Sequence, residues 1–459
     1  MRSKTKYTGV ELMGTAPVGT AIIRLAMPMM VAMLAQSIFS LTDMFFIGQT
    51  GDPNMIAAVS IAFPLYMVAQ GMGNIFATGG SNYISRMLGA EKVDKAKQAA
   101  SVSFYSAIVI GLILMAVLWV FKTPLLWIIG VSDATFYHTD DYFSALLVAM
   151  PFAAAGSVMS GLMRSEGETK KAMTQQLVGI GINFVLNPIF ILWLGWGTAG
   201  AGWATVIAQA AAFTYGVRYF ISKGTILSIT FSDCKPDKEM MGKILSIGIP
   251  AGLNNLVMSF SFILVNRIAV TYGDHVVAGN GVQMRVGSLF FMLVFAIVMG
   301  YQPFAGYNYG AKQFERLRKG FKLTALYSSG LCVIGFIVLR LFGEYFIRFF
   351  INDPLTIEAG STILRIFIWG IPVMGIQVTL MVSFQAFGKP VQALVINMGR
   401  QLLLYIPLLY ILNDIFGFYG FLWAQPTADI LTTGIAIALG FSLVKLMRGA
   451  GSTVSHLVK

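Results

Sequence analysis

Charged residues are scarce in this sequence. Asp, Glu, Lys and Arg make up 11% of its 459 residues, whereas soluble domains carry about 25%. Hydrophobic residues account for 56% of the chain, and the mean hydropathy is +0.74. This balance excludes an ordinary soluble domain and predicts an all-α polytopic membrane protein embedded in a lipid bilayer.

Cysteine, histidine and the motifs of common catalytic sites are also scarce or missing. Cys234 in a polar loop and Cys332 in an apolar run leave no disulfide framework or CxxC metal site. His138, His275 and His456 are expected in loops or the tail, so we expect no buried histidine relay and no metal site. Without a Walker A, HExxH or GxSxG motif, we expect neither direct use of ATP nor an enzyme.

Twelve apolar runs, bounded by polar residues or by Gly and Pro, predict twelve transmembrane helices. The first run is long and has no small-residue cleavage site, which indicates a retained helix rather than a signal peptide. The runs cover 20–48, 56–80, 99–121, 142–163, 173–194, 199–220, 243–271, 277–304, 321–341, 361–386, 391–412 and 418–444.

The basic residues follow membrane topology. Three face the side opposite the N-terminus (Lys122, Arg340 and Arg348), and four lie within runs (Arg267, Arg285, Arg365 and Arg400). The other 25 of the 32 Lys and Arg fall at the two ends and in alternate loops. By the positive-inside rule both termini and the 221–241 loop are cytoplasmic. Because the positive charge is not gathered into one patch, we expect no nucleic-acid partner.

The chain repeats itself at an offset of 220–222 residues. This predicts an N-lobe at 1–220 (helices 1–6), a cytoplasmic linker at 221–241 and a C-lobe at 242–459 (helices 7–12). An even number of helices in each lobe implies a pseudo-twofold axis along the membrane normal. The landmarks are Pro28 and Pro250, LGAEKVDKA (88–96) and YGAKQFERL (309–317), Pro151 and Pro372, Gly167 and Gly388, and Trp203 and Trp423.

These two lobes, the LGA and YGA signatures and MGYQPFAGYNYGAK at 299–312 resemble the multidrug and toxic compound extrusion (MATE) family. The resemblance covers residues 15–448, and the last motif most resembles the bacterial multidrug-export branch. It implies a monomeric secondary active efflux transporter of the bacterial plasma (inner) membrane. Such a protein exports organic cations and amphipathic drugs by alternating access.

The resemblance also implies a cation-coupling set in the N-lobe. TDMFFIG puts Asp43 on the family's first-helix aspartate, and NFVLNP puts Asn183 on its asparagine and Asn187 where an aspartate is common. Thr205 in GWATV matches the threonine of this network, and Tyr142, expected at the outer start of the fourth helix, matches a tyrosine.

The chemistry of these residues points the same way. An acid inside a bilayer helix is costly and therefore a functional candidate, although Asp43 at an interface, reaching water, is the alternative. One carboxylate, two amides and a hydroxyl can hold a proton or a hard cation, or the amides can simply join helices. Pro28 matches the family's bending proline, and its missing N–H weakens the helix one turn earlier.

The coupling ion is H+ in our interpretation, with Na+ as the alternative, and no other cofactor is expected. Asn187 in place of a second acid removes charge compensation that sodium needs, whereas a proton needs one titrating group. The seventh and tenth runs contain no acid in LVMSFSFILV and IQVTLMVSFQ. Asp429, the one deep acid of the C-lobe, is expected to pair with Arg400, for structure or function, and Arg285 to line the cavity.

A soft, promiscuous substrate cavity is expected from methionine and glutamine, although each alone is more ordinary as packing. Two rivals remain: export of a metabolite or lipid-linked sugar, for which the twelve helices and Asp43 are unsuited, and an intramembrane enzyme. The cavity candidates are Gln36, Gln70, Met67, Met72, Gln283, Met292 and Met299.

Overall fold

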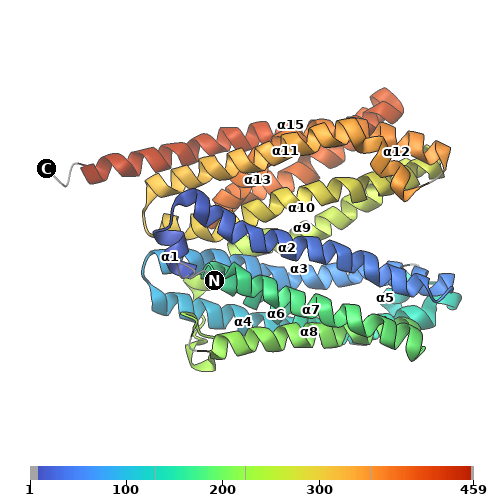
Figure 1. Ribbon diagram of the computed structural model, residues 1–459, viewed down its shortest axis with the longest axis horizontal. Coiled ribbons are helices and arrows are strands. Elements are labelled where there is room, and N and C mark those ends of the chain that lie inside the picture. The colour runs from blue at the N-terminus through green and yellow to red at the C-terminus, as the bar shows by residue number, and fades with distance from the viewer. Residues whose placement is uncertain (1–8, 130, 223, 352, 456–459) are drawn as a thin grey trace, which may run out of the picture. The chain divides into compact units, whose positions relative to one another are not determined.

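The computed structural model describes residues 9–129, 131–222, 224–351 and 353–455, without the side chains of 38–44, 63–70, 442 and 444–455. All regular structure in these residues is helical (Figure 1). The first half contains α1 (Gly9–Gly14), α2 (Val18–Gly48), α3 (Pro53–Gly89), α4 (Val93–Val120), α5 (Lys122–Ile128), α6 (Asp133–Ser165), α7 (Thr169–Pro188), the π-helix η1 (Ile189–Trp193) and α8 (Gly197–Ile221).

The second half follows the short 3-10 turn η2 (Phe231–Asp233). It contains α9 (Lys238–Thr271), α10 (Asp274–Gly310), α11 (Phe314–Phe350), α12 (Pro354–Phe367), η3 (Ile368–Gly370), α13 (Ile371–Ala386), α14 (Pro390–Met398), the π-helix η4 (Gly399–Tyr405) and α15 (Ile406–Ser455). Gly417 (φ 58°, ψ −137°) divides α15 into two helices.

These elements form twelve long helical segments, as predicted. In the described residues, nine stretches are long and apolar enough to cross a membrane, and one of them, 390–441, contains the two helices that meet at Gly417. In α3, the residues whose side chains are described contain a shorter apolar stretch at 53–62, which is not among these nine. The remaining segment, α8, is rich in Gly, Ala and Thr. The fold class therefore agrees with the prediction.

The helices extend beyond the apolar runs. The fourth run was expected from 142, but α6 begins at Asp133 and is capped by Ser132 and Thr135, which bond each other's backbone. Tyr142 therefore lies more than two turns inside α6, and its expected position at the helix start is wrong. His138 and His275, expected in loops, lie in α6 and α10. Apolar runs mark only the hydrocarbon-buried part of a helix, whose polar ends continue into water.

The internal repeat is visible in the backbone. In the described residues, only Glu91 (φ 58°) and Lys312 (φ 56°) combine a positive φ with a side chain. They lie at the same turn of the two halves, directly after α3 and α10. Gly167 (φ 83°) and Gly388 (φ 71°) form a second matched pair after α6 and α13. Each pair is 221 residues apart, so the two halves repeat in conformation as well as sequence.

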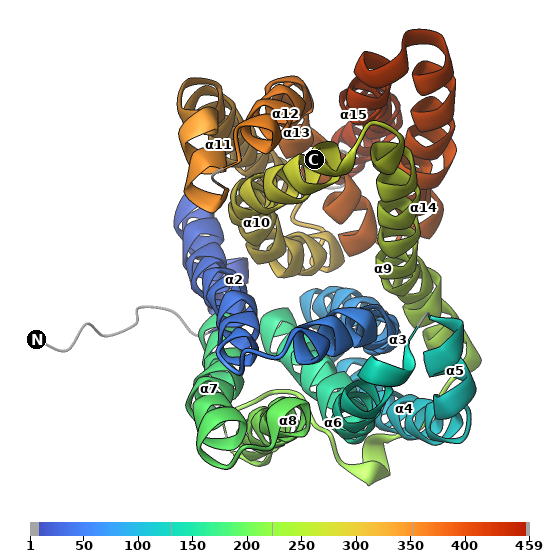
Figure 2. The same cartoon turned by 90° about the vertical axis from the view of Figure 1, so that its right-hand side faces the viewer.

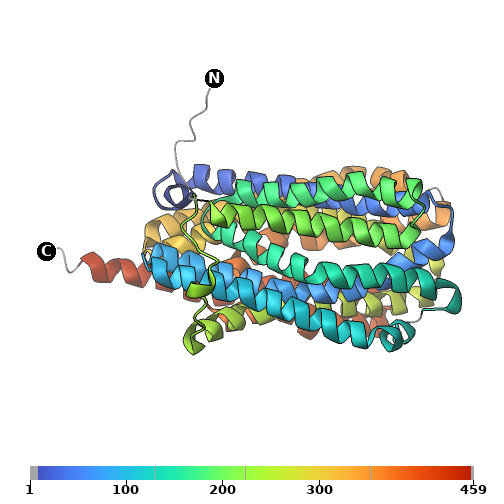
Figure 3. The same cartoon turned by 90° about the horizontal axis from the view of Figure 1, so that it is seen from below.

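Two compact units divide the described chain: 9–10 with 31–256, and 11–30 with 257–455. Within the first, α3 and α6 approach so closely that a Cβ on Gly73 would lie 2.9 Å from the Ala154 Cα. Figure 2 shows α3, α4, α6, α7 and α8 end-on, and Figure 3 shows α7 and α8 running side by side. Within the second, Gly375 of α13 meets Ser329 of α11 in the same manner. Small residues permit such contacts between membrane helices.

A buried carboxylate anchors the 221–241 linker to the first unit. Glu166, directly after α6, is 3% exposed. Its Oε1 accepts hydrogen bonds from Thr225 Oγ1 (2.7 Å), Ile226 N (2.9 Å) and Leu227 N (2.7 Å), and its Oε2 accepts one from Tyr219 OH (2.8 Å). Burial raises the pKa of Glu166 above its ordinary value, against the opposing effect of these donors.

We expect Glu166→Gln to flatten the pH dependence of stability. The folded protein holds the Glu166 proton more tightly than the unfolded chain, so stability falls as pH rises from about 4.5 through the raised pKa. A glutamine cannot ionise, and its Oε1 can keep the three linker bonds. Thermal unfolding in detergent from pH 4 to pH 9 measures this, with Glu168→Gln as the control for a neighbouring acid. An unchanged slope in Glu166→Gln would contradict the assignment.

Candidate functional site

Three of the predicted coupling residues lie together in the first unit. Asn183 and Asn187 are one turn apart on α7 and therefore share a helix face, which meets Thr205 of α8. Asn187 Nδ2 donates to Asn183 Oδ1 (2.8 Å), and Asn183 Nδ2 donates to Thr205 Oγ1 (3.1 Å). Thr205 Oγ1 in turn donates to the Ala201 carbonyl (3.1 Å). The three side chains are between 0% and 8% exposed.

The direction of this chain of hydrogen bonds has a chemical consequence. Each of these three bonds joins a neutral donor to a neutral acceptor, and the Thr205 hydroxyl donates to a backbone carbonyl. Neither an amide nor a hydroxyl titrates near neutral pH. The network can therefore orient a bound proton or cation through its oxygens, but the negative charge that attracts it must come from elsewhere.

Tyr142 lies beside this network through its backbone. Its side chain is buried, and a Cβ placed on Gly202 of α8 would lie 3.2 Å from the Tyr142 carbonyl oxygen. Gly202 is one turn before Thr205. The structure thus brings α6 to the same level of α8 as the asparagine and threonine side chains.

The predicted acid lies outside the described residues. Position 43 belongs to α2, but the Asp43 side chain is not described, and the same holds for Met67 and Gln70 of α3. Pro28 lies inside α2, which continues through it to Gly48. Gln36 of α2 accepts a hydrogen bond at 3.4 Å from Gln176 Nε2 of α7, a contact that was not predicted from the sequence.

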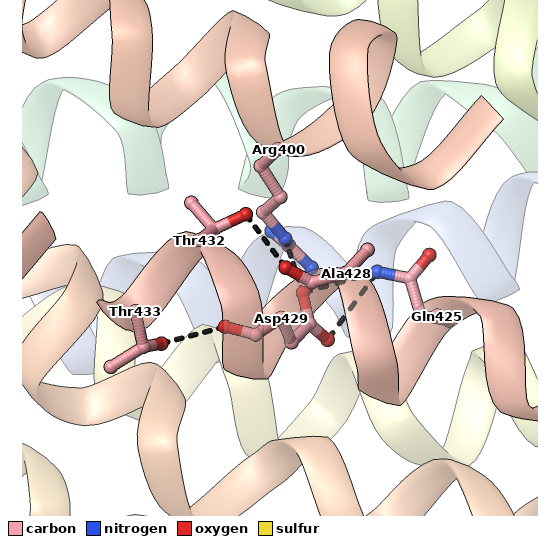
Figure 4. Close-up of polar contacts among 6 residues, drawn as sticks. All are labelled: Arg400, Gln425, Ala428, Asp429, Thr432 and Thr433. Atoms are coloured by element: carbon pink, nitrogen blue, oxygen red, sulfur yellow. Dashed lines mark hydrogen bonds and ion pairs between the residues drawn. The ribbon is translucent and has the colours of Figure 1, made fainter. Parts of the chain in front are cut away.

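The second unit contains the predicted ion pair (Figure 4). Arg400 Nε lies 2.5 Å from Asp429 Oδ1, and the Asp429 side chain is 1% exposed. Gln425, one turn earlier on α15, donates to both carboxylate oxygens at 3.3 and 3.4 Å. Arg400 belongs to the π-helix η4, and such bulges in α-helices are frequent at functional sites.

Local backbone features make room for this pair. A Cβ on Gly370, at the end of η3, would lie 2.9 Å from Asp429 Oδ2, so the absence of a side chain there admits the carboxylate. Thr433 Oγ1 donates to the Asp429 carbonyl oxygen at 2.7 Å. Neither Gln425 nor Gly370 was predicted from the sequence. The i, i+4 spacing of Gln425 and Asp429 was a usable signal, whereas the Gly370 contact between distant segments was not.

The repeat places different chemistry at matching positions. The residues 221 before Arg400 and Asp429 are Gly179 and Ala208. A Cβ on Gly179 would lie 3.4 Å from the Ala208 carbonyl oxygen, so these positions also face each other. The first half therefore has a close contact between uncharged small residues where the second has a buried ion pair. The two copies have diverged at this level of their fifth and sixth helices.

The remaining cavity candidates are scattered over the two units. Met72 is half-buried, and Met299 packs against the cluster of Val298, Val378 and Val382. Gln283 is 3% exposed, Met292 is half-buried and Arg285 is exposed. In the described residues, no ion pair joins Arg285 to Asp429. For Met299 the packing alternative fits its contacts.

A family model described as MatE matches the chain twice, at residues 28–189 and 250–411. The two matches start 222 residues apart, at the offset of the sequence landmarks, and together they cover more than half of the chain. The chain belongs to the MatE family. The resemblance to MATE transporters in the sequence motifs is thereby confirmed.

Individual relatives agree with this membership. The MatE protein is 28% identical over 428 residues to "Multidrug export protein MepA" of Staphylococcus aureus (strain N315), covering 93% of this chain and 94% of the relative. It is 29% identical over 423 residues to the protein of that name from Staphylococcus haemolyticus, covering 92% and 93%. A solved outward-facing MATE family transporter matches its fold with a TM-score of 0.91 at 23% identity, over 97% of this chain and 99% of that one.

Proposed function

We propose that this MatE protein is an antiporter of the bacterial plasma membrane that exports organic cations and amphipathic drugs by alternating access in exchange for protons. The observation that carries the proton assignment is the buried Asn187–Asn183–Thr205 chain of hydrogen bonds, whose amides and hydroxyl can orient a proton but do not titrate. The names of the staphylococcal relatives support the substrate class.

Asp43 supplies the negative charge that the two amides and the hydroxyl cannot carry themselves. Of the three helices α2, α7 and α8, none contains another Asp or Glu. Helix register supports the assignment: position 43 is seven residues after Gln36, and Asn183 is seven residues after Gln176. Seven residues make two helical turns. Position 43 therefore lies on the same face of α2 as Gln36, and position 183 lies on the same face of α7 as Gln176, and these two glutamines are joined by a hydrogen bond. Because α2 and α7 both begin at the predicted cytoplasmic side, both seven-residue spacings run toward the same side of the membrane, which places positions 43 and 183 at a similar depth.

The transport cycle follows from this arrangement. A proton on Asp43 neutralises the carboxylate, which lowers the cost of burying it, and its loss restores a charge that attracts an organic cation. Pro28 lies in the same helix, where the missing N–H permits bending between the two charge states. One carboxylate then serves proton and substrate alternately, which is the requirement of an exchanger.

Transport by purified protein in proteoliposomes tests this function. We expect a fluorescent organic cation to accumulate when the compartment that receives it is acidic, and the accumulation to collapse when an ionophore dissipates the proton gradient. An anionic dye of similar size provides the control and is expected not to accumulate. If no organic cation moved under a proton gradient, the proposal would be refuted. Export of a metabolite or lipid-linked sugar would then be the favoured function.

The Thr205 hydroxyl gives a graded test of the network. Thr205→Val keeps the side-chain shape but removes the acceptor of Asn183 Nδ2, and we expect about fivefold slower proton-driven transport from the loss of a hydrogen bond of about 1 kcal/mol. Thr205→Ser keeps the hydroxyl and is the matched control, with a rate close to that of wild type. Equal rates for valine and serine would mean that the network only joins α7 to α8.

A further inference from the structure

Three arginines gather around one pocket at the end of α11 and α12 opposite the cytoplasmic loops. The pocket has a volume of about 300 Å³ and is lined by Arg340, Arg348 and Arg365 together with Glu344 and Ser361. Three positive charges against one negative charge leave a net charge of +2. This surplus is unusual, because only a few of the 32 Lys and Arg of the chain lie on this side.

Glu344 organises two of the arginines and leaves the third available. Its Oε1 accepts from Arg348 Nη2 (2.7 Å) and Nε (3.2 Å), and its Oε2 accepts from Arg365 Nη2 (3.3 Å). The Arg348 and Arg365 side chains remain 61% and 62% exposed, so each has further N–H groups to donate. For Arg340, also exposed, the described residues contain no hydrogen bond or ion pair.

The pocket wall contains a polar group that also lacks a partner. Ser361 is 6% exposed, and its Oγ has no hydrogen-bond partner in the part of the chain that the structure describes. A buried hydroxyl without a partner is unfavourable, and a ligand oxygen in the pocket would satisfy it. Guanidinium groups and a hydroxyl together form the donor set that binds phosphate oxygens.

The position along α11 fits the headgroup level of a bilayer. At 1.5 Å per residue the 37-residue helix is about 55 Å long, whereas the hydrocarbon layer is about 30 Å thick. The apolar run 321–341 ends where the pocket begins. Leu341 and Tyr345, which line it, are 65% and 71% exposed, as expected of side chains that face lipid near the interface.

We propose that this pocket binds the phosphate of an anionic phospholipid in the outer leaflet. The donors come from Arg340, Arg348, Arg365 and Ser361, and the apolar side chains beside them contact the acyl chains. The shared chemistry is a phosphate ester, and the exposed Leu341 and Tyr345 favour a lipid over a soluble anion as its source.

Native mass spectrometry of the detergent-purified protein tests the proposal with phosphatidylglycerol, phosphatidylcholine and glycerol 3-phosphate as separate probes. We expect phosphatidylglycerol to bind tighter than phosphatidylcholine, and Arg340→Gln to weaken it about tenfold, the effect of one charge-assisted hydrogen bond. Glu344→Gln, which raises the net charge of the pocket, is expected to tighten binding about threefold. Arg267→Gln, an exposed arginine of α9 outside the pocket, is the matched control and leaves binding unchanged.

The opposite directions expected for Arg340→Gln and Glu344→Gln separate binding from folding, since lost stability would weaken both variants. Arg340-dependent binding of glycerol 3-phosphate without lipid binding would support the phosphate site and assign it to a soluble anion. Equal affinity for both lipids, or the same phosphatidylglycerol affinity in wild type and Arg340→Gln, would overturn the proposal.

Discussion

Asp43→Asn is expected to lower proton-driven efflux of an organic cation by roughly 100-fold, at the upper end of usual coupling free energies. The asparagine keeps the size of the side chain and one acceptor oxygen, but it replaces the other oxygen by an NH2 donor and cannot ionise. Because α2, α7 and α8 contain no other acid, no neighbouring carboxylate in these helices can take over its proton. Initial rates in proteoliposomes under an imposed proton gradient measure the effect.

Two variants make this result interpretable. Asp43→Glu keeps the titrating group and is expected to retain measurable transport, which would exclude a purely steric role. Asp52→Asn removes a half-buried acid at the N-cap of α3 and is expected to transport at the wild-type rate. Proton-driven transport by Asp43→Asn at the wild-type rate would mean that Asp43 is an interfacial residue.

Arg400→Met is expected to destabilise the protein by about 3–5 kcal/mol, because it leaves the Asp429 carboxylate buried without its partner. Asp429 is 1% exposed, so water cannot replace the guanidinium. Gln425 donates at 3.3 and 3.4 Å, which compensates only in part for an ion pair at 2.5 Å. Reversible unfolding in mixed micelles measures the loss of free energy.

The double variant distinguishes structure from function at this pair. Arg400→Met with Asp429→Leu removes both charges, and replacing a buried pair by apolar residues is often neutral or stabilising. We therefore expect it to recover most of the stability that Arg400→Met loses, a strong coupling in the double-mutant cycle. Recovered stability with recovered transport would make the pair structural, whereas recovered stability without transport would give it a part in the cycle. Additive losses would contradict the pairing.

The fold was predictable because a bilayer imposes a simple rule. A helix that crosses it needs about 20 apolar residues, and apolar runs of that length are legible in the sequence. The internal repeat was legible for a similar reason: turns after α3 and α10 need the same backbone conformation, which Glu91 and Lys312 share at an offset of 221. Helix ends such as that of α6 were not predictable from hydropathy, because capped polar turns continue past the apolar part.

The candidate sites were predictable from the sequence only where polar residues at helical spacing share one helix face, or where a charged residue lies deep within an apolar run. Asn183 and Asn187 are four residues apart, and Asp429 and Arg400 are deep charges that require a partner. The contact of Gly370 with the Asp429 carboxylate and the pocket around Arg340 depend on how separate helices meet. No local sequence pattern predicts these contacts between separate helices.

The most direct test of proton exchange is to drive protons with the substrate. Proteoliposomes loaded with an organic cation and a pH-sensitive dye are diluted into a buffer that contains neither the organic cation nor sodium. If the protein exchanges the cation for protons, the lumen acidifies as the cation leaves, and Asp43→Asn lowers the rate of acidification by roughly 100-fold, as it does the efflux. Proton exchange would be contradicted if the lumen pH stayed unchanged and efflux of the organic cation appeared only after sodium was added outside, together with sodium entry.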